Sequence, residues 1–200
     1  MDNTQQQTIL EYQTQLLAWN KTHNLISKNQ EKYVSEHIED SLLISHTLQK
    51  HVVDLGSGGG LPGIPLAIVN PNKQLYLVES NTKKSSFLLN TTSRLKLKNT
   101  TVINKRIEDI NRDELPEKYD IVCRAVGSAS SIISFAKKHL KHDGVRLKLM
   151  KTAEQFNEEQ MPPGYEVKEI EKYTSKAKDK TRILVTIEAC LLYTSDAADE

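Results

Sequence analysis

The sequence predicts an α/β fold with a mostly parallel sheet of seven strands, N-terminal helices and a C-terminal antiparallel hairpin. Three observations predict it. The apolar pair Val52 and Val53 leads straight into a glycine-rich turn, strand-like and helical segments alternate after it, and the last two strand-like runs have no helix between them. Strands joined through helices lie parallel, whereas two consecutive strands joined by a loop pair antiparallel.

The composition indicates a single ordinary domain. The chain has 200 residues, 26% of them charged, and a formal net charge of +1, so any polyanion must be met by local patches. Its two cysteines, Cys123 and Cys190, lie far apart without metal-ligand spacing, which predicts a reducing compartment and no metal site. The first residues are polar and no run of eighteen apolar residues occurs, so we expect a cytoplasmic protein that is not bound to a membrane.

The first 48 residues predict two helices. Apolar residues between Ile9 and Trp19 fall near helical spacing, and those between Tyr33 and Leu48 do so again. We expect residues 1–48 to form a helical extension packed on a core domain of residues 49–189.

The glycine-rich turn Gly56–Gly60 indicates a site for a nucleotide-type cofactor. Glycine permits backbone angles that a Cβ forbids and lets the chain approach a ligand closely, and the helix that follows offers free N–H groups. Pro62 is expected early in that helix, where its missing N–H costs no hydrogen bond. The strand-like run Gln74–Glu79 then ends in a carboxylate, at the place where such folds bind ribose hydroxyls. Glu79 could also be only a solvated strand terminus, and dinucleotide dehydrogenases use a similar turn.

The remaining elements follow from spacing, caps and turn residues. Asn81 is a plausible helix cap, Asp143-Gly144 a turn, and Pro162-Pro163-Gly164 a helix breaker. The expected helices cover residues 82–95, 132–140 and 153–160, and the expected strands cover residues 101–103, 119–123, 145–150, 165–170 and 183–187.

Five segments together resemble the glucose-inhibited division protein B (GidB) family. They are Trp19-Asn20-Lys21, Asn24-Leu25-Ile26-Ser27, His37-Ile38-Glu39-Asp40-Ser41, the stretch from Asp54 to Ala67, and Cys123-Arg124-Ala125. The continuation Leu61-Pro62-Gly63-Ile64-Pro65 is the most specific part, because generic methyltransferases lack it. The resemblance covers about Leu16 to Ile187. It implies a Rossmann-like class I methyltransferase that uses S-adenosylmethionine to methylate N7 of a guanine in bacterial small-subunit (16S) ribosomal RNA.

The resemblance also implies the cofactor site. Its positions correspond to Gly56, Gly58 and Leu61 in the glycine turn, and to Glu79, Ile107, Glu108 and Arg124 beyond it. Glu79 can accept two hydrogen bonds from a ribose diol, and the Ile107 N–H with the Glu108 side chain suits an adenine edge. Asp54 is expected beside the amino-acid end of the cofactor.

The implied reaction requires little acid–base chemistry, because N7 of guanine has a free lone pair and loses no proton. We therefore assign no general base, and Arg124, Lys151 and His37 are the candidates for positioning the reactants. A histidine on a partly apolar helix face is more often a packed, hydrogen-bonded group, so both interpretations of His37 stay open.

RNA contact is expected from a few basic residues. Most basic clusters, including the loop with Lys176, Lys178 and Lys180, are expected to be solvated faces. Lys151 and Arg182 are the exceptions, because they match basic positions of the family near the catalytic end. The expected partner is small-subunit ribosomal RNA or a ribosomal particle, and the expected state is a monomer.

Two departures from the family pattern stand out. Val145 and Thr152 occupy positions where the family often has glycine, and residues 190–200 extend past the last strand as an expected non-native tail. A genuine acidic tail is the alternative. For the whole chain, a methyltransferase acting on a small molecule or protein and a non-catalytic nucleotide-binding or RNA-binding module remain alternatives.

Overall fold

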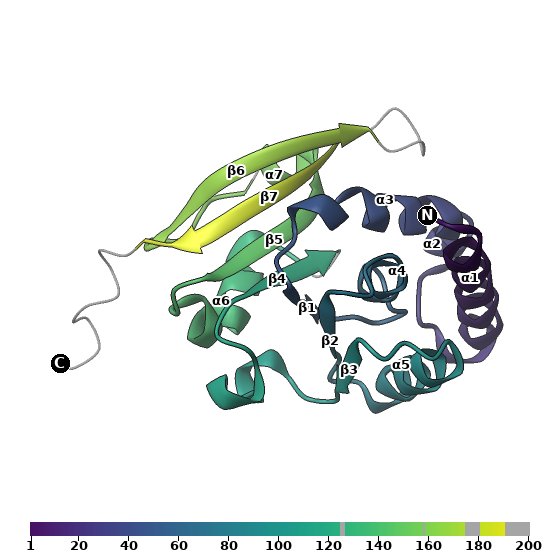
Figure 1. The fold of residues 1–200 in the computed structure, drawn as a ribbon. Helices are drawn as coiled ribbons and strands as arrows, with labels where there is room; N and C mark the ends of the chain where they lie inside the picture. Colours follow the sequence, from purple (N-terminus) through teal and green to yellow (C-terminus); the bar gives the residue numbers. More distant parts are fainter. Residues whose placement is uncertain (125–126, 158, 175–180, 191–200) are drawn as a thin grey trace.

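The computed structural model describes residues 1–124, 127–157, 159–174 and 181–190, and it is built around one seven-stranded sheet (Figure 1). The strands are β1 (His51–Leu55), β2 (Gln74–Val78), β3 (Thr100–Ile103), β4 (Tyr119–Arg124), β5 (Val145–Thr152), β6 (Tyr165–Thr174) and β7 (Thr181–Ala189). All seven expected strands are present, which confirms the predicted α/β fold.

The strand order places the glycine turn at the centre of the sheet. The order is β3-β2-β1-β4-β5-β7-β6, with parallel pairing from β3 through β5 and antiparallel pairing of β7 with both β5 and β6. The predicted C-terminal hairpin is therefore confirmed. The strand order reverses between β1 and β4, and such a switch point opens a crevice at the carboxyl ends of the strands.

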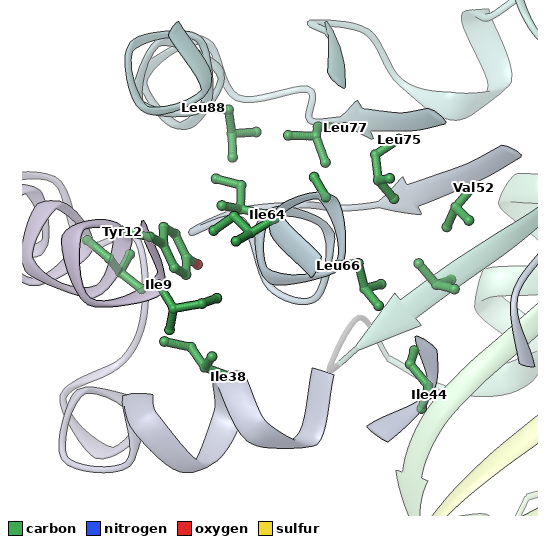
Figure 2. Packing of buried hydrophobic residues seen from close by; sticks show 14 of the residues in the cluster. Ile9, Tyr12, Ile38, Ile44, Val52, Ile64, Leu66, Leu75, Leu77 and Leu88 are labelled. Carbon is green, nitrogen blue, oxygen red and sulfur yellow. The ribbon is translucent and has the colours of Figure 1, made fainter. Parts of the chain in front are cut away.

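Helices cover both faces of the sheet (Figure 1). Side chains alternate along each strand, so Val52 joins one apolar cluster and Val53 the other. The helical elements of the first face are α1 (Asn3–His23), α3 (Val34–Leu43), α4 (Gly63–Val69) and α5 (Thr82–Arg94), whose packing is shown in Figure 2. Those of the second face are the short helix η2 (Ile107–Asp109) and α6 (Ala129–Leu140).

The N-terminal segment contains three α-helices and one short helical turn, whereas its apolar spacing predicts two helices. Asp2 caps α1 in a reciprocal capping box with Gln5. A short helix α2 (Lys28–Glu31) precedes α3, and the helix expected to reach Leu48 ends at Leu43, followed by the single turn η1 (Ser45–Thr47). The prediction was wrong there because Ile44 and Leu48 are buried outside the helix, so their apolar spacing continues after its hydrogen bonds stop.

Other boundaries also differ from expectation, and β5, β6, β7 and α6 are each longer than predicted. Pro62 directly precedes α4 as its N-cap residue instead of lying inside the helix. The helix expected over residues 153–160 is α7 (Ala153–Asn157), and its last expected turn is not helical at residues 159 and 160. The short helix η3 (Arg112–Glu114) completes the elements. Some predictions fall outside the described residues, namely those for Ala125, Lys176, Lys178, Lys180 and residues 191–200.

No helix in the described part of the chain is long and apolar enough to cross a membrane.

Candidate functional site

A pocket of about 160 Å³ lies where β1, β2 and β3 end. Carboxyl ends of parallel strands at a switch point are the usual ligand position in open α/β sheets. The pocket is lined by Leu55, Gly56, Val78, Glu79, Ser80, Lys105, Arg106, Ile107, Glu108 and Phe135.

The glycine turn lies beside the pocket, which Gly56 lines. Gly56, Gly58 and Gly60 have φ angles of 73°, 51° and 89°, which L side chains rarely adopt. The N–H groups of Gly56 and Ser57 both donate to the Val78 carbonyl, at 2.9 and 3.1 Å. The left-handed angles and these bonds fold the turn back toward the end of β2, which brings backbone close to the pocket.

Glu79 connects the end of β2 to the turn. Its Oε2 accepts a hydrogen bond from the Gly58 N–H at 2.9 Å, and its Oε1 accepts one from the Asn81 N–H at 2.8 Å. Each carboxylate oxygen has two lone pairs, so both can accept a further hydrogen bond. The side chain is therefore held in place and still able to bind hydroxyl groups.

Asp54 is the most strongly perturbed acid of the site. It is 1% exposed, its Oδ2 accepts the Gly63 N–H at 3.0 Å, and its Oδ1 is buried with no hydrogen-bond partner among the described residues. Burial raises the pKa of Asp54 from 3.8 to about 7, against the opposing effect of the Gly63 N–H. A buried carboxylate with a free oxygen favours a cation or a hydrogen-bond donor beside it.

The opposite wall of the pocket is held by a buried histidine. His139 of α6 contacts the Tyr119 hydroxyl through Nδ1 at 2.8 Å and the Ile107 carbonyl through Nε2 at 3.0 Å. A carbonyl only accepts, so Nε2 carries the proton and Nδ1 accepts from Tyr119. Burial lowers the pKa of His139, which agrees with this neutral form. The histidine thereby anchors Ile107 at the pocket.

A charged cluster lies near the end of β4, against the N-terminal helices. Asp40 of α3 is 2% exposed, and its Oδ2 lies 3.5 Å from Arg182 Nε of β7. Arg124 donates to the His37 carbonyl at 3.4 Å, and Asp40 is the main opposite charge acting on it. Burial, Arg124 and Arg182 lower the pKa of His37 to about 4, so its ring is neutral at pH 7.

Lys151 is engaged within the protein. Its Nζ forms an ion pair with Glu159 and donates to the Gly127 carbonyl at 3.0 Å, and its side chain is 10% exposed. This position is at the carboxyl end of β5, because the strand continues to Thr152 and does not stop at Met150.

The structure brings together some of the residues predicted from the sequence. Gly56, Glu79, Ile107 and Glu108 line one pocket, and Gly58 binds Glu79 directly. Gly58 itself does not line the pocket, and neither do the other five predicted residues: these are Leu61, His37, Arg124, Lys151 and Arg182, with His37 beside Arg124.

Sequence reasoning missed several lining residues. Lys105 and Arg106 come one residue after the end of β3, so the rule about carboxyl ends of strands could have found them. Phe135 is 43% exposed on α6 although Ile132, Ile133 and Ala136 beside it are buried. Its position out of phase with the buried face of its helix is the signal that could have indicated it.

The residues present fit S-adenosylmethionine. Glu79 suits the ribose diol, the free oxygen of Asp54 suits a positively charged group, and Phe135 with Ile107 offers an apolar wall for a purine. Among the described residues, no group of three or more His, Cys, Asp or Glu side chains could hold a metal ion.

Comparison with known proteins identifies the family. The family model for rRNA small subunit methyltransferase G matches residues 5–185. The chain is 34% identical over 187 residues to Ribosomal RNA small subunit methyltransferase G of Hydrogenovibrio crunogenus, covering 91% of this chain and 84% of that protein. It is 35% identical over 195 residues to the protein of that name from Burkholderia multivorans, covering 94% and 85%.

Solved structures agree on the fold. Magnesium protoporphyrin IX methyltransferase from Synechocystis, solved with bound S-adenosylmethionine, superposes with a TM-score of 0.56 at 12% identity, covering 89% of this chain and 97% of that one. The matched residues and the identity to two bacterial relatives show that this chain belongs to the rRNA small subunit methyltransferase G (GidB) family.

Proposed function

We propose that this chain is an S-adenosylmethionine-dependent methyltransferase that transfers a methyl group to N7 of a guanine in small-subunit ribosomal RNA. The observation that carries the proposal is the pocket at the carboxyl edge of the sheet, with Glu79 held by the glycine turn and the buried carboxylate of Asp54 nearby. The family supports ribosomal RNA as the substrate class.

The residues of the pocket bind the cofactor in distinct ways. Glu79 accepts hydrogen bonds from the ribose hydroxyls, and Gly56 and Gly58 let the backbone approach the methionine part. Ile107 and Glu108 bind the adenine edge. By the family pattern Leu61 and Arg124 also contact the cofactor, beyond the residues that line the pocket.

The bound cofactor supplies an already activated methyl group on a sulfonium. Guanine N7 carries its lone pair in the plane of the ring, so no residue of the chain needs to remove a proton. The work of the protein is to hold N7 in line with the methyl group and to tolerate the positive charge that develops on the base. The buried acids Asp54 and Glu79 lie close to each other at this edge and favour that charge, whereas Asp40 is paired with Arg182.

The target guanine must be presented outside a stacked helix, because the major groove of RNA is too narrow for side chains to read. Arg182 and Lys151 are the proposed phosphate contacts, with Arg124, Lys151 and His37 as positioning residues. Lys151 must exchange its ion pair with Glu159 to reach a phosphate. Residues 1–48 are proposed as a helical extension, residues 49–189 as the methyltransferase domain and residues 190–200 as a non-native tail, in a monomeric cytoplasmic protein.

The product distinguishes N7 from other methylation sites. Methylation at N7 gives the purine a fixed positive charge and makes its imidazole ring labile to borohydride, after which aniline cleaves the RNA chain at that guanine. We expect one cleavage site in small-subunit RNA treated with the enzyme and cofactor, and none without cofactor. Methyl incorporation without cleavage would refute N7 but keep the methyltransferase.

Labelled S-adenosylmethionine tests the alternative substrates. Ribosomal particles from a strain that lacks the enzyme should accept label, whereas free metabolites and total protein should not. Turnover on a metabolite without RNA would instead favour a small-molecule methyltransferase. Absence of cofactor binding by calorimetry would favour a non-catalytic module.

A further inference from the structure

Tyr12 links the first helix to the glycine turn. Its side chain is completely buried, and its hydroxyl donates a hydrogen bond to the Gly59 carbonyl at 2.7 Å, across 47 residues of sequence. Figure 2 shows the ring extending from α1 toward Ile64 of α4. One polar atom of an N-terminal helix therefore binds the backbone that forms the cofactor site.

The turn is held from two sides. Its first half is fixed by the sheet, because the N–H groups of Gly56 and Ser57 donate to the Val78 carbonyl and that of Gly58 donates to Glu79. Its second half lies against the N-terminal segment. The Tyr12 bond to Gly59 is made on that side.

Close packing on the same side explains why residue 59 is glycine. A Cβ added at Gly59 would lie 3.0 Å from Leu16 Cδ1 and 3.0 Å from Ile26 Cγ2. The φ angle of Gly59 is not in the left-handed region, so the backbone alone does not require glycine here. A side chain at this position would require the ends of the Leu16 and Ile26 side chains to shift by a few tenths of an ångström.

We infer that Tyr12 is a positioning residue of the cofactor site, whose hydroxyl holds the glycine turn in the conformation that binds S-adenosylmethionine. The inference rests on the proposed function in assuming that the cofactor binds at this turn. Burial raises the pKa of Tyr12 well above its usual value, so the hydroxyl keeps its proton and remains a donor at every working pH. The extension then contributes to cofactor affinity through α1, without touching the cofactor.

The test is Tyr12→Phe in the full chain, which keeps the ring and removes only the hydroxyl. If the turn populates other conformations, only the fraction of molecules with the turn in its binding conformation can bind S-adenosylmethionine, and the apparent affinity falls in proportion to that fraction. Loss of one buried hydrogen bond lowers that fraction. We expect calorimetry to show a dissociation constant for S-adenosylmethionine raised about threefold to tenfold. The rate at saturating cofactor should stay within about twofold, because the turn is ordered once the cofactor is bound.

Thr92→Val is the matched control. Thr92 of α5 is also buried, and its hydroxyl donates to the carbonyls of its own helix at Leu88 and Leu89. This variant should lose a similar amount of thermal stability and bind cofactor like the wild type. Amide hydrogen exchange without cofactor should quicken across residues 56–63 in Tyr12→Phe but not in Thr92→Val.

The outcomes separate the two proposals. If Tyr12→Phe loses stability as the control does but keeps the wild-type dissociation constant and exchange at the turn, Tyr12 is merely structural and the inference is overturned. If the wild-type protein itself does not bind S-adenosylmethionine, the proposed function fails first.

Discussion

Asp54→Asn offers a test of the electrostatics of the site. The substitution keeps the size and shape of the side chain and the acceptor for the Gly63 N–H, which lies 3.0 Å from Asp54 Oδ2. It removes the ionisation of a carboxyl that is 1% exposed. The expected result is a change in how stability depends on pH, together with weaker cofactor binding.

The magnitude follows from the pKa of Asp54, which burial raises from 3.8 to about 7. Between these two values the unfolded chain has lost the proton while the folded protein still holds it, so wild-type stability falls as pH rises, and above about 7 the loss is complete. The slope from one group is at most about 1.4 kcal/mol per pH unit. From pH 5 to pH 7 the free energy of unfolding should therefore shift in favour of Asp54→Asn by about 2 kcal/mol relative to wild type.

Urea denaturation at pH 5, 6, 7 and 8 measures this shift in the protein without cofactor. Asp120→Asn is the control, because Asp120 is equally buried but is paired with Arg146 near the amino end of the neighbouring strand β4, away from the pocket. Calorimetry at pH 8 should show cofactor affinity lowered about tenfold or more in Asp54→Asn, the value of one charge-assisted hydrogen bond, and unchanged in Asp120→Asn. A stability difference between Asp54→Asn and wild type that stays constant from pH 5 to pH 8 would refute the raised pKa.

Three further substitutions test the cofactor turn, the charged cluster and RNA contact. Gly58→Val places a β-branched side chain at a φ of 51°, so we expect the free energy of unfolding to fall by about 1–2 kcal/mol. Circular dichroism should show that the fold is retained, and cofactor binding should be lost. Micromolar binding of the cofactor would contradict the assignment of the site. Arg124→Ala should lower the rate of methyl transfer at least about tenfold. Thermal stability should change little, because Asp40 keeps its ion pair with Arg182. An unaltered rate would exclude a role for Arg124. Replacing Lys151 and Arg182 together by Ala should reduce the salt dependence of RNA binding by about two phosphate contacts and leave cofactor affinity unchanged, and an unchanged salt slope would show that neither residue binds a phosphate.

The sheet could be predicted from local patterns because each pattern reports a local constraint. Strand alternation, the glycine turn and the loop between the last two strands depend on residues close in sequence, and the structure confirms all seven strands. Boundaries were less predictable. Ile44 and Leu48 are buried outside α3, since burial depends on the neighbours of a residue and not on whether its backbone is helical.

In the candidate site, too, some residues could be predicted from the sequence and others could not. Gly56 and Glu79 were predictable because each directly follows a strand, and parallel strands bring their carboxyl ends to one edge. Phe135 was not predicted, because it reaches the pocket from a helix on the second face of the sheet. Lys151 was predicted as an RNA contact from the family pattern, whereas its ion pair with Glu159 depends on how the chain after β5 folds back.

The sequence by itself determined the fold class, the family and the position of the glycine turn, because these reside in periodicity and in short contiguous motifs. Only the tertiary structure decided which distant residues complete the site: Tyr12 on the glycine turn, His139 behind Ile107, and Asp40 between two arginines. Each of these contacts joins residues that are separated by tens of positions in the chain. Their partners are set by the packing of helices on the sheet, which no local pattern encodes.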